Sequence, residues 1–132
     1  MTSCNDKTVK CILLREPTEE QSRQIVGLYR DQGWWQSRDD HSARLVPRLI
    51  AGSNCFVIAT EGDKIVGMGR VISDGVSDAY IHDLTVRHDR RKQGIGQLIL
   101  QTLLERLHTN GINWIGLIAE PGSGNLYRRA GF

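Results

Sequence analysis

The sequence predicts one α/β domain with a mixed, mostly antiparallel central sheet that is flanked by helices. Segments with the two-residue apolar alternation of strands are interspersed with segments of helical spacing. In the middle of the chain, three strand-like segments follow one another through short turn signals, which is typical of an antiparallel meander. The 132 residues, 39% of them hydrophobic, suit a single domain over residues 1–132. The predicted order is strand, helix, helix, three strands, helix, strand, helix.

The N-terminal part of the chain is predicted to form one strand and two helices. Residues 10–15 form a strand that ends before a proline. Thr18 is placed to cap the next helix, because Gln21 three residues later completes a capping-box pattern. Gly33 ends that helix. Residues 41–51 form the second helix, and the proline inside it predicts a kink or a division into two.

The rest of the chain contains the meander, a long helix, a strand and a short helix. Residues 55–60 and 64–72 are strand-like and are joined by a Gly-Asp dipeptide, which is typical of a hairpin turn. An Asp-Gly turn then leads to a third strand at residues 79–86. After the long helix come a strand at 114–119 and a short helix at 125–130. The long helix, at residues 94–107, is predicted from apolar residues on one face, namely Ile95, Leu98, Ile99, Leu103 and Leu107.

Composition argues against several classes of function. The formal net charge of +2 provides no bulk field for binding nucleic acid or a membrane surface. No apolar stretch approaches the roughly 20 residues of a membrane span, and the polar N-terminus does not resemble a secretory signal. The three cysteines are widely spaced and the four histidines lack ligand spacing, which favours reduced thiols, a cytoplasmic protein and no metal site.

The segment from Val86 to Gly96 joins the last meander strand to the long helix and has the features of a phosphate-binding turn. The first amides of a helix lack internal acceptors, and the helix dipole favours an anion there. Gly94 and Gly96 have no Cβ, so a polyanion can approach the backbone closely. The Walker pattern and the dinucleotide fingerprint are both absent. The alternative interpretation is a solvated basic turn, formed by Arg87, Arg90, Arg91 and Lys92.

The pattern Arg91-x-x-Gly94-x-Gly96 resembles the acyl-CoA-binding motif of the GNAT (GCN5-related N-acetyltransferase) family. The chain ends in Tyr127-x-x-x-Gly-Phe132, which is similar to a second signature of that family. The Val-Gly step at residues 66–67 resembles the family's third strand. The resemblance covers nearly the whole chain. It implies a GNAT-like fold, acetyl-CoA as cosubstrate, no metal, and acetyl transfer to a primary amine by direct attack in a ternary complex.

The resemblance also implies a binding site for acetyl-CoA. The strands at 79–86 and 114–119 are expected to splay apart so that pantetheine inserts between them. The Val86 amide would polarise the thioester carbonyl, and Asn125 could reach the CoA arm. Backbone groups at Leu84, Thr85 and Val86 would bind pantetheine, and amides of Arg91, Lys92, Gln93, Gly94, Ile95 and Gly96 would hold the pyrophosphate.

The resemblance places Tyr127 as the general acid that protonates the departing thiolate. A phenol with an ordinary pKa of about 10 is suited to that role. The alternative is a core tyrosine packed on Phe132. Asp83 is the preferred candidate for the base that deprotonates the amine, with a structural carboxylate that caps a nearby loop as the alternative. Side chains alternate along a strand, so His82 and Asp83 cannot both face one cleft unless a bulge intervenes.

The acceptor pocket is predicted less sharply than the CoA site. Trp34 and Trp35 follow the first helix, and Glu120 follows the strand at 114–119. Aromatic faces and carboxylates suit a cationic or aromatic amine, of a small molecule or a peptide. Tryptophans in the core are the alternative. Two other functions stay open: a CoA-binding sensor that has lost catalysis, and a polyanion binder that uses the basic turn.

The family normally continues past its Gly-Phe signature with one or two further strands. The resemblance therefore predicts that the final family strands are missing from this sequence. The strand at 114–119 would then have an unpaired edge, and such an edge favours self-association. The alternatives left open are a trimmed chain, a shortened family variant and a missing strand supplied by a partner subunit, and a homodimer is one way to cover the edge.

Overall fold

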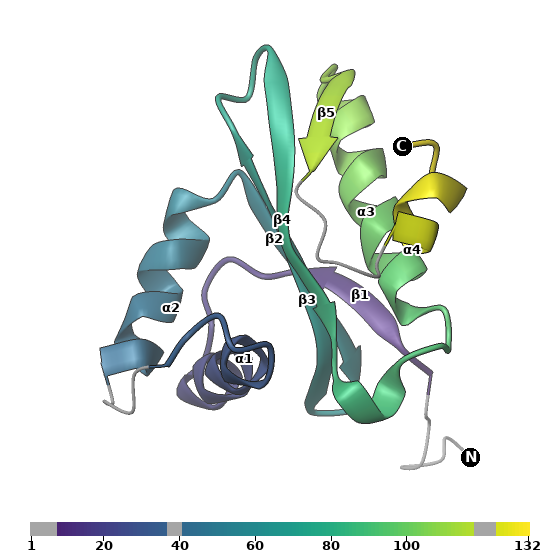
Figure 1. Ribbon diagram of the computed structural model, residues 1–132. Coiled ribbons are helices and arrows are strands. Elements are labelled where there is room, and N and C mark those ends of the chain that lie inside the picture. Colours follow the sequence, from purple (N-terminus) through teal and green to yellow (C-terminus); the bar gives the residue numbers. More distant parts are fainter. Residues whose placement is uncertain (1–7, 37–40, 118–123) are drawn as a thin grey trace, which may run out of the picture.

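An antiparallel meander with one added parallel strand forms the sheet of the computed structural model, which describes residues 8–36, 41–117 and 124–132 (Figure 1). Within these residues the strand order follows the chain from β1 to β5. Strands β1 to β4 pair antiparallel, whereas β5 runs parallel to β4. The predicted mixed, mostly antiparallel sheet is confirmed. The strands are β1 (Lys10–Leu13), β2 (Cys55–Glu61), β3 (Lys64–Ser73), β4 (Asp78–Val86) and β5 (Trp114–Leu117).

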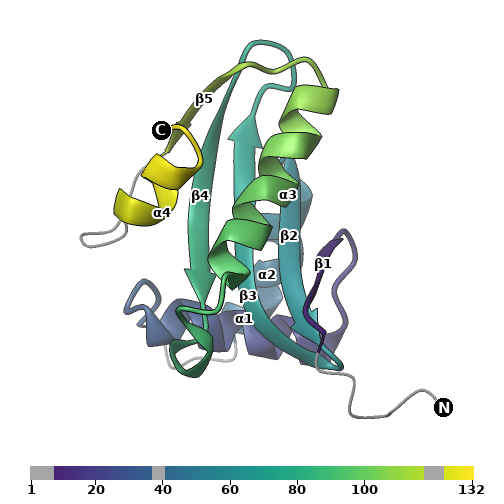
Figure 2. The same cartoon turned by 90° about the vertical axis from the view of Figure 1, so that its right-hand side faces the viewer.

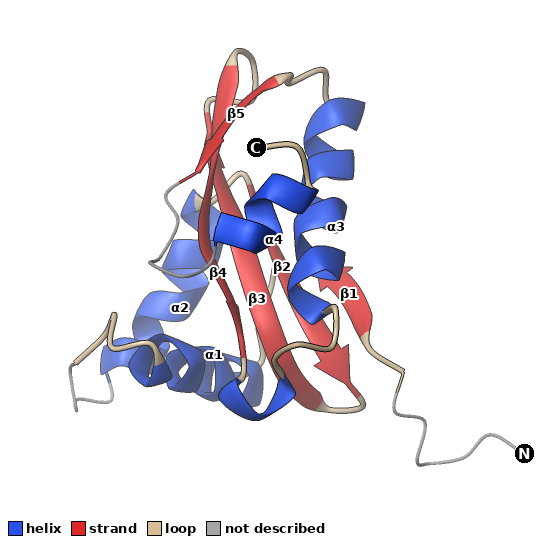
Figure 3. Cartoon of the chain, turned by 45° about the vertical axis from the view of Figure 1, so that its right-hand side comes forward, coloured by secondary structure: helices blue, strands red, loops and turns tan. Residues whose placement is uncertain are grey.

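Helices cover both faces of this sheet. Figures 1 and 3 show two helices on one face and the long helix on the other, with the short C-terminal helix beside the long one. The order of helices and strands matches the predicted order, and a 3₁₀ turn that was not predicted follows β4. The helices are α1 (Glu19–Asp31), α2 (His41–Gly52), α3 (Ile95–Thr109) and α4 (Gly124–Arg129), and the 3₁₀ turn is η1 (His88–Arg90). None of the described helices is long and apolar enough to cross a membrane.

The central strands are buried on both faces, because successive side chains point to opposite sides of the sheet. Residues 55–59 of β2 are all buried, with Phe56 and Ile58 facing α1 and α2 while Val57 faces α3. Each face contributes to its own apolar cluster. The α1–α2 side includes Ile25, Tyr29, Val46 and Met68, and the α3 side includes Val66, Val71, Ile99, Leu103 and Leu107.

Two details of the predicted helices are corrected by the structure. Helix α2 runs unbroken through Pro47, because Val46 and Ile50 anchor both halves in the α1–α2 core; the predicted division is therefore wrong. The apolar face of α3 is also wrong at one position, since Leu98 is 37% exposed and Leu100 is fully buried. Positions four residues apart drift around the helix axis, which carries the buried stripe toward Leu100 and away from Leu98.

The N-terminus of α1 has the predicted capping box. The Thr18 hydroxyl accepts a hydrogen bond from the Gln21 amide at 3.1 Å, and the Gln21 side chain accepts one from the Thr18 amide at 2.9 Å. Replacing Thr18 with alanine removes one of these bonds. We expect it to lower the free energy of unfolding by about 1 kcal/mol, measured by urea denaturation. A Thr18→Ser variant keeps the hydroxyl and is the control, and equal losses in both variants would contradict the capping role.

Candidate active site

An open cleft of about 680 Å³ lies where β4, the start of α3 and helix α4 come together. Its walls combine backbone from the second half of β4 with basic side chains of the turn after it. Trp34 and Gln32, which follow α1, close one end. The remaining lining residues are Ile81, His82, Asp83, Leu84, Thr85, Val86, Arg90, Arg91, Lys92, Gly94, Ile95, Gly96, Gln97, Leu126, Tyr127 and Arg129.

The cleft follows the second half of β4, and the described part of the β4–β5 ladder lies in the first half. Among the described residues, that ladder ends where Ile81 pairs with Leu117. Figure 2 shows β5 and α4 on the same side of β4. The Arg87 amide donates to the Val66 carbonyl at 2.7 Å, so the backbone polar groups of Arg87 face β3. Along the end of β4, every second residue then directs its backbone groups away from β3. The backbone polar groups of Leu84 and Val86 consequently face away from β3 and toward the cleft.

A β-bulge interrupts β4 within the cleft. Thr85 pairs with Met68 and His82 pairs with Arg70, so two β4 residues stand opposite one β3 residue, Gly69. Asp83 occupies the left-handed region at φ 59°, which is uncommon for a residue other than glycine. This turn of the backbone reverses the alternation, and both His82 and Asp83 line the cleft. The alternation of side chains along a strand predicted that both could face one cleft only if a bulge intervened, and this is the bulge.

The start of α3 forms the opposite wall of the cleft. Gly94 is the helix N-cap and lies in the left-handed region at φ 82°. The first hydrogen bond of the helix runs from the Leu98 amide to the Gly94 carbonyl at 3.1 Å. The amides of residues 95–97 precede it and have no acceptor within the helix. A Cβ at Gly96 would lie 3.4 Å from Leu126 and 3.7 Å from Val86, so this glycine brings α3 close to both.

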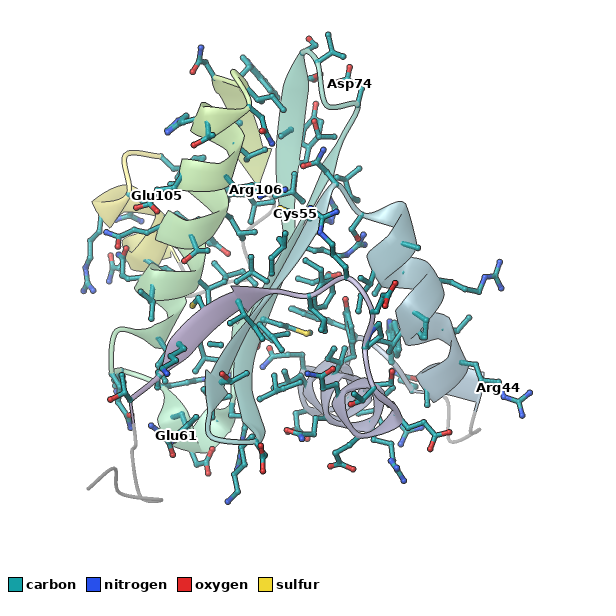
Figure 4. The ribbon with its side chains drawn as sticks, turned by 180° about the vertical axis from the view of Figure 1, so that it is seen from behind. Arg44, Cys55, Glu61, Asp74, Glu105 and Arg106 are labelled. Carbon is teal, nitrogen blue, oxygen red and sulfur yellow. The ribbon has the colours of Figure 1, made fainter. Side chains whose placement is uncertain are left out.

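Basic side chains surround this end of the cleft. The Arg91 guanidinium donates to the Val86 carbonyl at 3.2 Å, which ties the basic turn to the end of β4. Arg90 forms an ion pair with Glu61, and the hydrogen bond between them raises the pKa of Arg90. Figure 4 shows Glu61 at the end of β2, beside that turn. Lys92 also lines the cleft and is exposed. The side chains therefore favour a bound polyanion.

Tyr127 lies in α4 and has features of both predicted roles, a core tyrosine packed on Phe132 and a general acid at the cleft. Its side chain is buried, at 7% exposure, and its ring contacts Phe132 edge-on at a centroid distance of 6.3 Å. It also lines the cleft, on the wall that α4 forms opposite β4. The amide of Phe132 donates to the Tyr127 carbonyl at 3.0 Å, which closes the end of α4. Packing thus holds a phenol at the wall of the cleft.

The Asp83 carboxylate is held by two donors from other elements. Its Oδ2 accepts a hydrogen bond from the Tyr29 hydroxyl at 2.7 Å and one from Arg70 Nε at 2.6 Å. The Arg70 and Asp83 side chains are 16% and 22% exposed, so their ion pair is largely shielded from water. Asp83 is therefore an ion-paired carboxylate at the cleft wall. The structure places no loop cap on it among the described residues.

The other predicted site residues divide into two groups. Trp34 lines the cleft, but Trp35 does not; its ring instead stacks on Tyr29 at a centroid distance of 4.1 Å. Gln93 and Asn125 are exposed and are not among the lining residues, so the structure does not place their side chains at the predicted CoA site. Glu120 lies outside the described residues, as does the end of the predicted strand at 118–119.

Several lining residues were not predicted. Gln97 projects from the first turn of α3 and donates to the Leu126 carbonyl at 3.1 Å, which joins α3 to α4. Arg129 comes two residues after Tyr127, and its position beside the chain's second motif is the one signal that could have indicated it. Gln32 has no such signal, because only the packing of α1 against the sheet brings it near β4. Each of these residues adds a polar group to the cleft.

The chain is similar to a known protein family and to curated proteins. Residues 29–132 match the family model described as "Acetyltransferase (GNAT) domain". An uncharacterized N-acetyltransferase, ycf52, of Gracilaria tenuistipitata var. liui is 34% identical over 89 residues, a match that covers 63% of this chain and 49% of that protein. The chain therefore spans about half the length of this curated relative.

Solved structures with the same fold are numerous. A GNAT-family acetyltransferase of Streptococcus pneumoniae superposes with a TM-score of 0.75 at 24% identity and covers 95% of this chain and 87% of its own. An acetyltransferase predicted in Clostridium acetobutylicum, whose structure was determined with acetyl-CoA, has a TM-score of 0.72 at 18% identity over 95% of this chain and 90% of its own. At these identities the likeness concerns the fold.

Proposed function

Because the chain belongs to the GNAT (GCN5-related N-acetyltransferase) family of acetyltransferases, we propose that it transfers an acetyl group from acetyl-CoA to a primary amine of a small molecule or peptide. The observation that carries the proposal is one cleft that combines two features. Its β4 wall presents the backbone groups of Leu84 and Val86, which face away from β3, and its α3 wall presents helix amides and basic side chains.

The residues present fit acetyl-CoA along the length of the cleft. The backbone groups of Leu84 and Val86, which face away from β3, would bind the amide-bearing pantetheine in the manner of an added strand. The amides at the start of α3 would hold the pyrophosphate, since the N-terminus of a helix favours an anion. Lys92 and Arg129 extend the positive charge on either side. A Cβ at Gly96 would fill part of the space between Val86 and Leu126.

Bound acetyl-CoA supplies a thioester, which a neutral amine can attack at its carbonyl carbon. The new C–N bond forms, the C–S bond breaks, and the electron pair of that bond leaves on the CoA sulfur. The Val86 amide would donate to the carbonyl oxygen as negative charge develops on it. The Tyr127 hydroxyl would protonate the departing thiolate. The position of the two residues on the walls of one cleft supports these roles.

The amine must lose a proton before it attacks, and we propose Asp83 as the general base that accepts this proton. A lysine-like amine with a pKa near 10.4 is almost entirely protonated at pH 7, so a nearby acceptor helps. Both recorded hydrogen bonds of Asp83 are made by its Oδ2, and the residue lines the cleft on the side of Trp34. His82 lines the same wall and is the second candidate. Trp34 would offer its ring to the amine.

A ligand-binding experiment tests the first half of the proposal. Saturating acetyl-CoA or CoA should raise the Tm by several degrees, because a ligand at about 100 times its Kd stabilises the native state by about 2.7 kcal/mol. ATP shares only the adenosine and phosphate groups and should stabilise less. Lack of stabilisation by either CoA compound would refute the proposal.

Thiol release tests the second half. A panel of small primary amines and lysine peptides, assayed for free CoA at saturating acetyl-CoA, should include at least one acceptor. Stabilisation by CoA without thiol release from any amine would favour a CoA-binding sensor instead. Binding of an oligonucleotide that weakens steeply with salt and is unaffected by CoA would favour a polyanion binder.

A further inference from the structure

Three elements meet at the side chain of Asp83. Tyr29 reaches it from α1, Arg70 reaches it from β3, and both donate to the same oxygen, Oδ2. The Arg70 guanidinium also donates to the Ser53 hydroxyl at 3.3 Å, so its orientation is constrained at a second point. Hydrogen bonds between a charged and a neutral or oppositely charged group are stronger than neutral ones. The cluster therefore restrains the position of Asp83.

Tyr29 acts on Asp83 from outside the cleft. Its side chain is 2% exposed and is not among the lining residues. Burial, the negative charge of Asp83 and the hydrogen bond to it together raise the pKa of the Tyr29 hydroxyl, so this group stays protonated and remains a donor. The ring stacks on Trp35 with an interplanar angle of 6°, which fixes where the hydroxyl points. Tyr29 touches no substrate in this arrangement.

The backbone of Asp83 needs such restraint. A φ of 59° puts this residue in the left-handed region, which is unfavourable for most residues other than glycine. The same residue forms the bulge opposite Gly69. On the α3 side, the Leu84 side chain packs over Gly69, where a Cβ would lie only 3.2 Å from it. The bulge is thus held on one face by packing and on the other by the bonds to Asp83.

We propose that Tyr29 and Arg70 are positioning residues for acetyl transfer, because they hold Asp83 in its left-handed conformation and so keep the bulge that turns the backbone of Leu84 and Val86 toward the cleft. This inference rests on the proposed function. Loss of either donor lets Asp83 relax toward an ordinary β conformation, which removes the reversal of alternation. The Val86 amide then no longer points at the position where the thioester oxygen develops charge.

A Tyr29→Phe variant tests this inference and keeps the ring and its stacking on Trp35. We expect kcat for thiol release to fall about tenfold, which corresponds to one charge-assisted hydrogen bond. KM for acetyl-CoA should rise as well, because the backbone groups of Leu84 and Val86, which would bind pantetheine, depend on the same bulge. Tyr80→Phe is the matched control, because Tyr80 is exposed on the same strand and does not line the cleft.

A second measurement does not depend on activity. The ¹⁵N–¹H cross-peaks of Leu84 and Val86 should move in Tyr29→Phe and in Arg70→Gln, and should stay in place in Tyr80→Phe. In an Asp83→Gly background, adding Tyr29→Phe should leave them unmoved, because glycine adopts a positive φ without support. A tyrosine that only fills the core would shift these cross-peaks equally in both backgrounds, and that result would overturn the inference.

The outcomes also separate this inference from the proposed function. Wild-type kcat and unmoved cross-peaks in Tyr29→Phe would refute the positioning role while leaving acetyl transfer intact. A wild-type protein that binds CoA but releases no thiol with any amine would refute acetyl transfer and, with it, the catalytic consequence proposed for Tyr29. The cross-peaks would still decide whether Tyr29 and Arg70 hold the bulge.

Discussion

Replacing Tyr127 with phenylalanine is expected to lower kcat for thiol release roughly a hundredfold, the lower end of what a positioned general acid contributes. The substitution removes only the hydroxyl. The edge-on contact of the ring with Phe132 and its burial in the α3-side core should persist. The dissociation constant of CoA should therefore change little. Turnover is measured at saturating acetyl-CoA and saturating acceptor amine, so that a binding defect does not enter the result.

Two controls make the Tyr127 result specific. Tyr80→Phe removes a hydroxyl from an exposed tyrosine of β4, outside the cleft lining, and should retain wild-type turnover. A thermal melt of Tyr127→Phe should show a Tm within a few degrees of wild type. Wild-type turnover in a correctly folded Tyr127→Phe protein would exclude the role of general acid and would favour the interpretation of Tyr127 as a core residue.

The second large effect concerns stability. Gly67 lies in β3, and a Cβ at this position would be 2.8 Å from Ile99 Cδ1 and 3.0 Å from the Thr85 carbonyl oxygen. The end of the isoleucine side chain can rotate away. The carbonyl oxygen cannot, because it belongs to the backbone of the β3–β4 ladder. Gly67→Ala should therefore lower the free energy of unfolding by about 2 kcal/mol, as overpacking does, and the Tm by roughly 6–10 °C.

Gly27 provides the matched control for this substitution. It lies inside α1 and has no atom within 4 Å of the position where a Cβ would be placed. Gly27→Ala should raise the free energy of unfolding by about 0.5–1 kcal/mol, because alanine favours a helix interior. Equal stability of the two variants in urea denaturation would contradict the close approach of β3 and β4. Since Gly67 pairs with Val86, we also expect Gly67→Ala to weaken CoA binding.

Local signals predicted most of the elements. The capping box at Thr18, the Gly-Asp turn after β2 and the glycine at the start of α3 are each decided by a few neighbouring residues, and all three occur in the structure. The basic turn and Gly94 likewise predicted one wall of the cleft, because the start of a helix carries its own amides and dipole. The predictions were less accurate for the ends of elements and for the burial of Leu98, because packing between elements decides both.

Which residues of β4 face the cleft could not be predicted from the sequence, because contacts between distant segments decide it. Alternation along a strand predicts that His82 and Asp83 face opposite sides, and only the bulge opposite Gly69 brings both to the cleft. Trp34 and Trp35 are adjacent in the chain, yet one lines the cleft and the other stacks on Tyr29. No composition or spacing distinguishes the two.

The sequence by itself determined the class of fold, the order of its elements and the glycine-marked start of α3, because periodicity, turn dipeptides and helix ends are properties of short segments. The tertiary structure decided the conformation of Asp83 and the direction of the backbone beside it. Tyr29 and Arg70 lie 54 and 13 residues from Asp83 in the chain, and they share one of its oxygens only after α1 and β3 have packed against β4. The free energy of that packing stabilises a backbone conformation that Asp83 would not adopt on local preference.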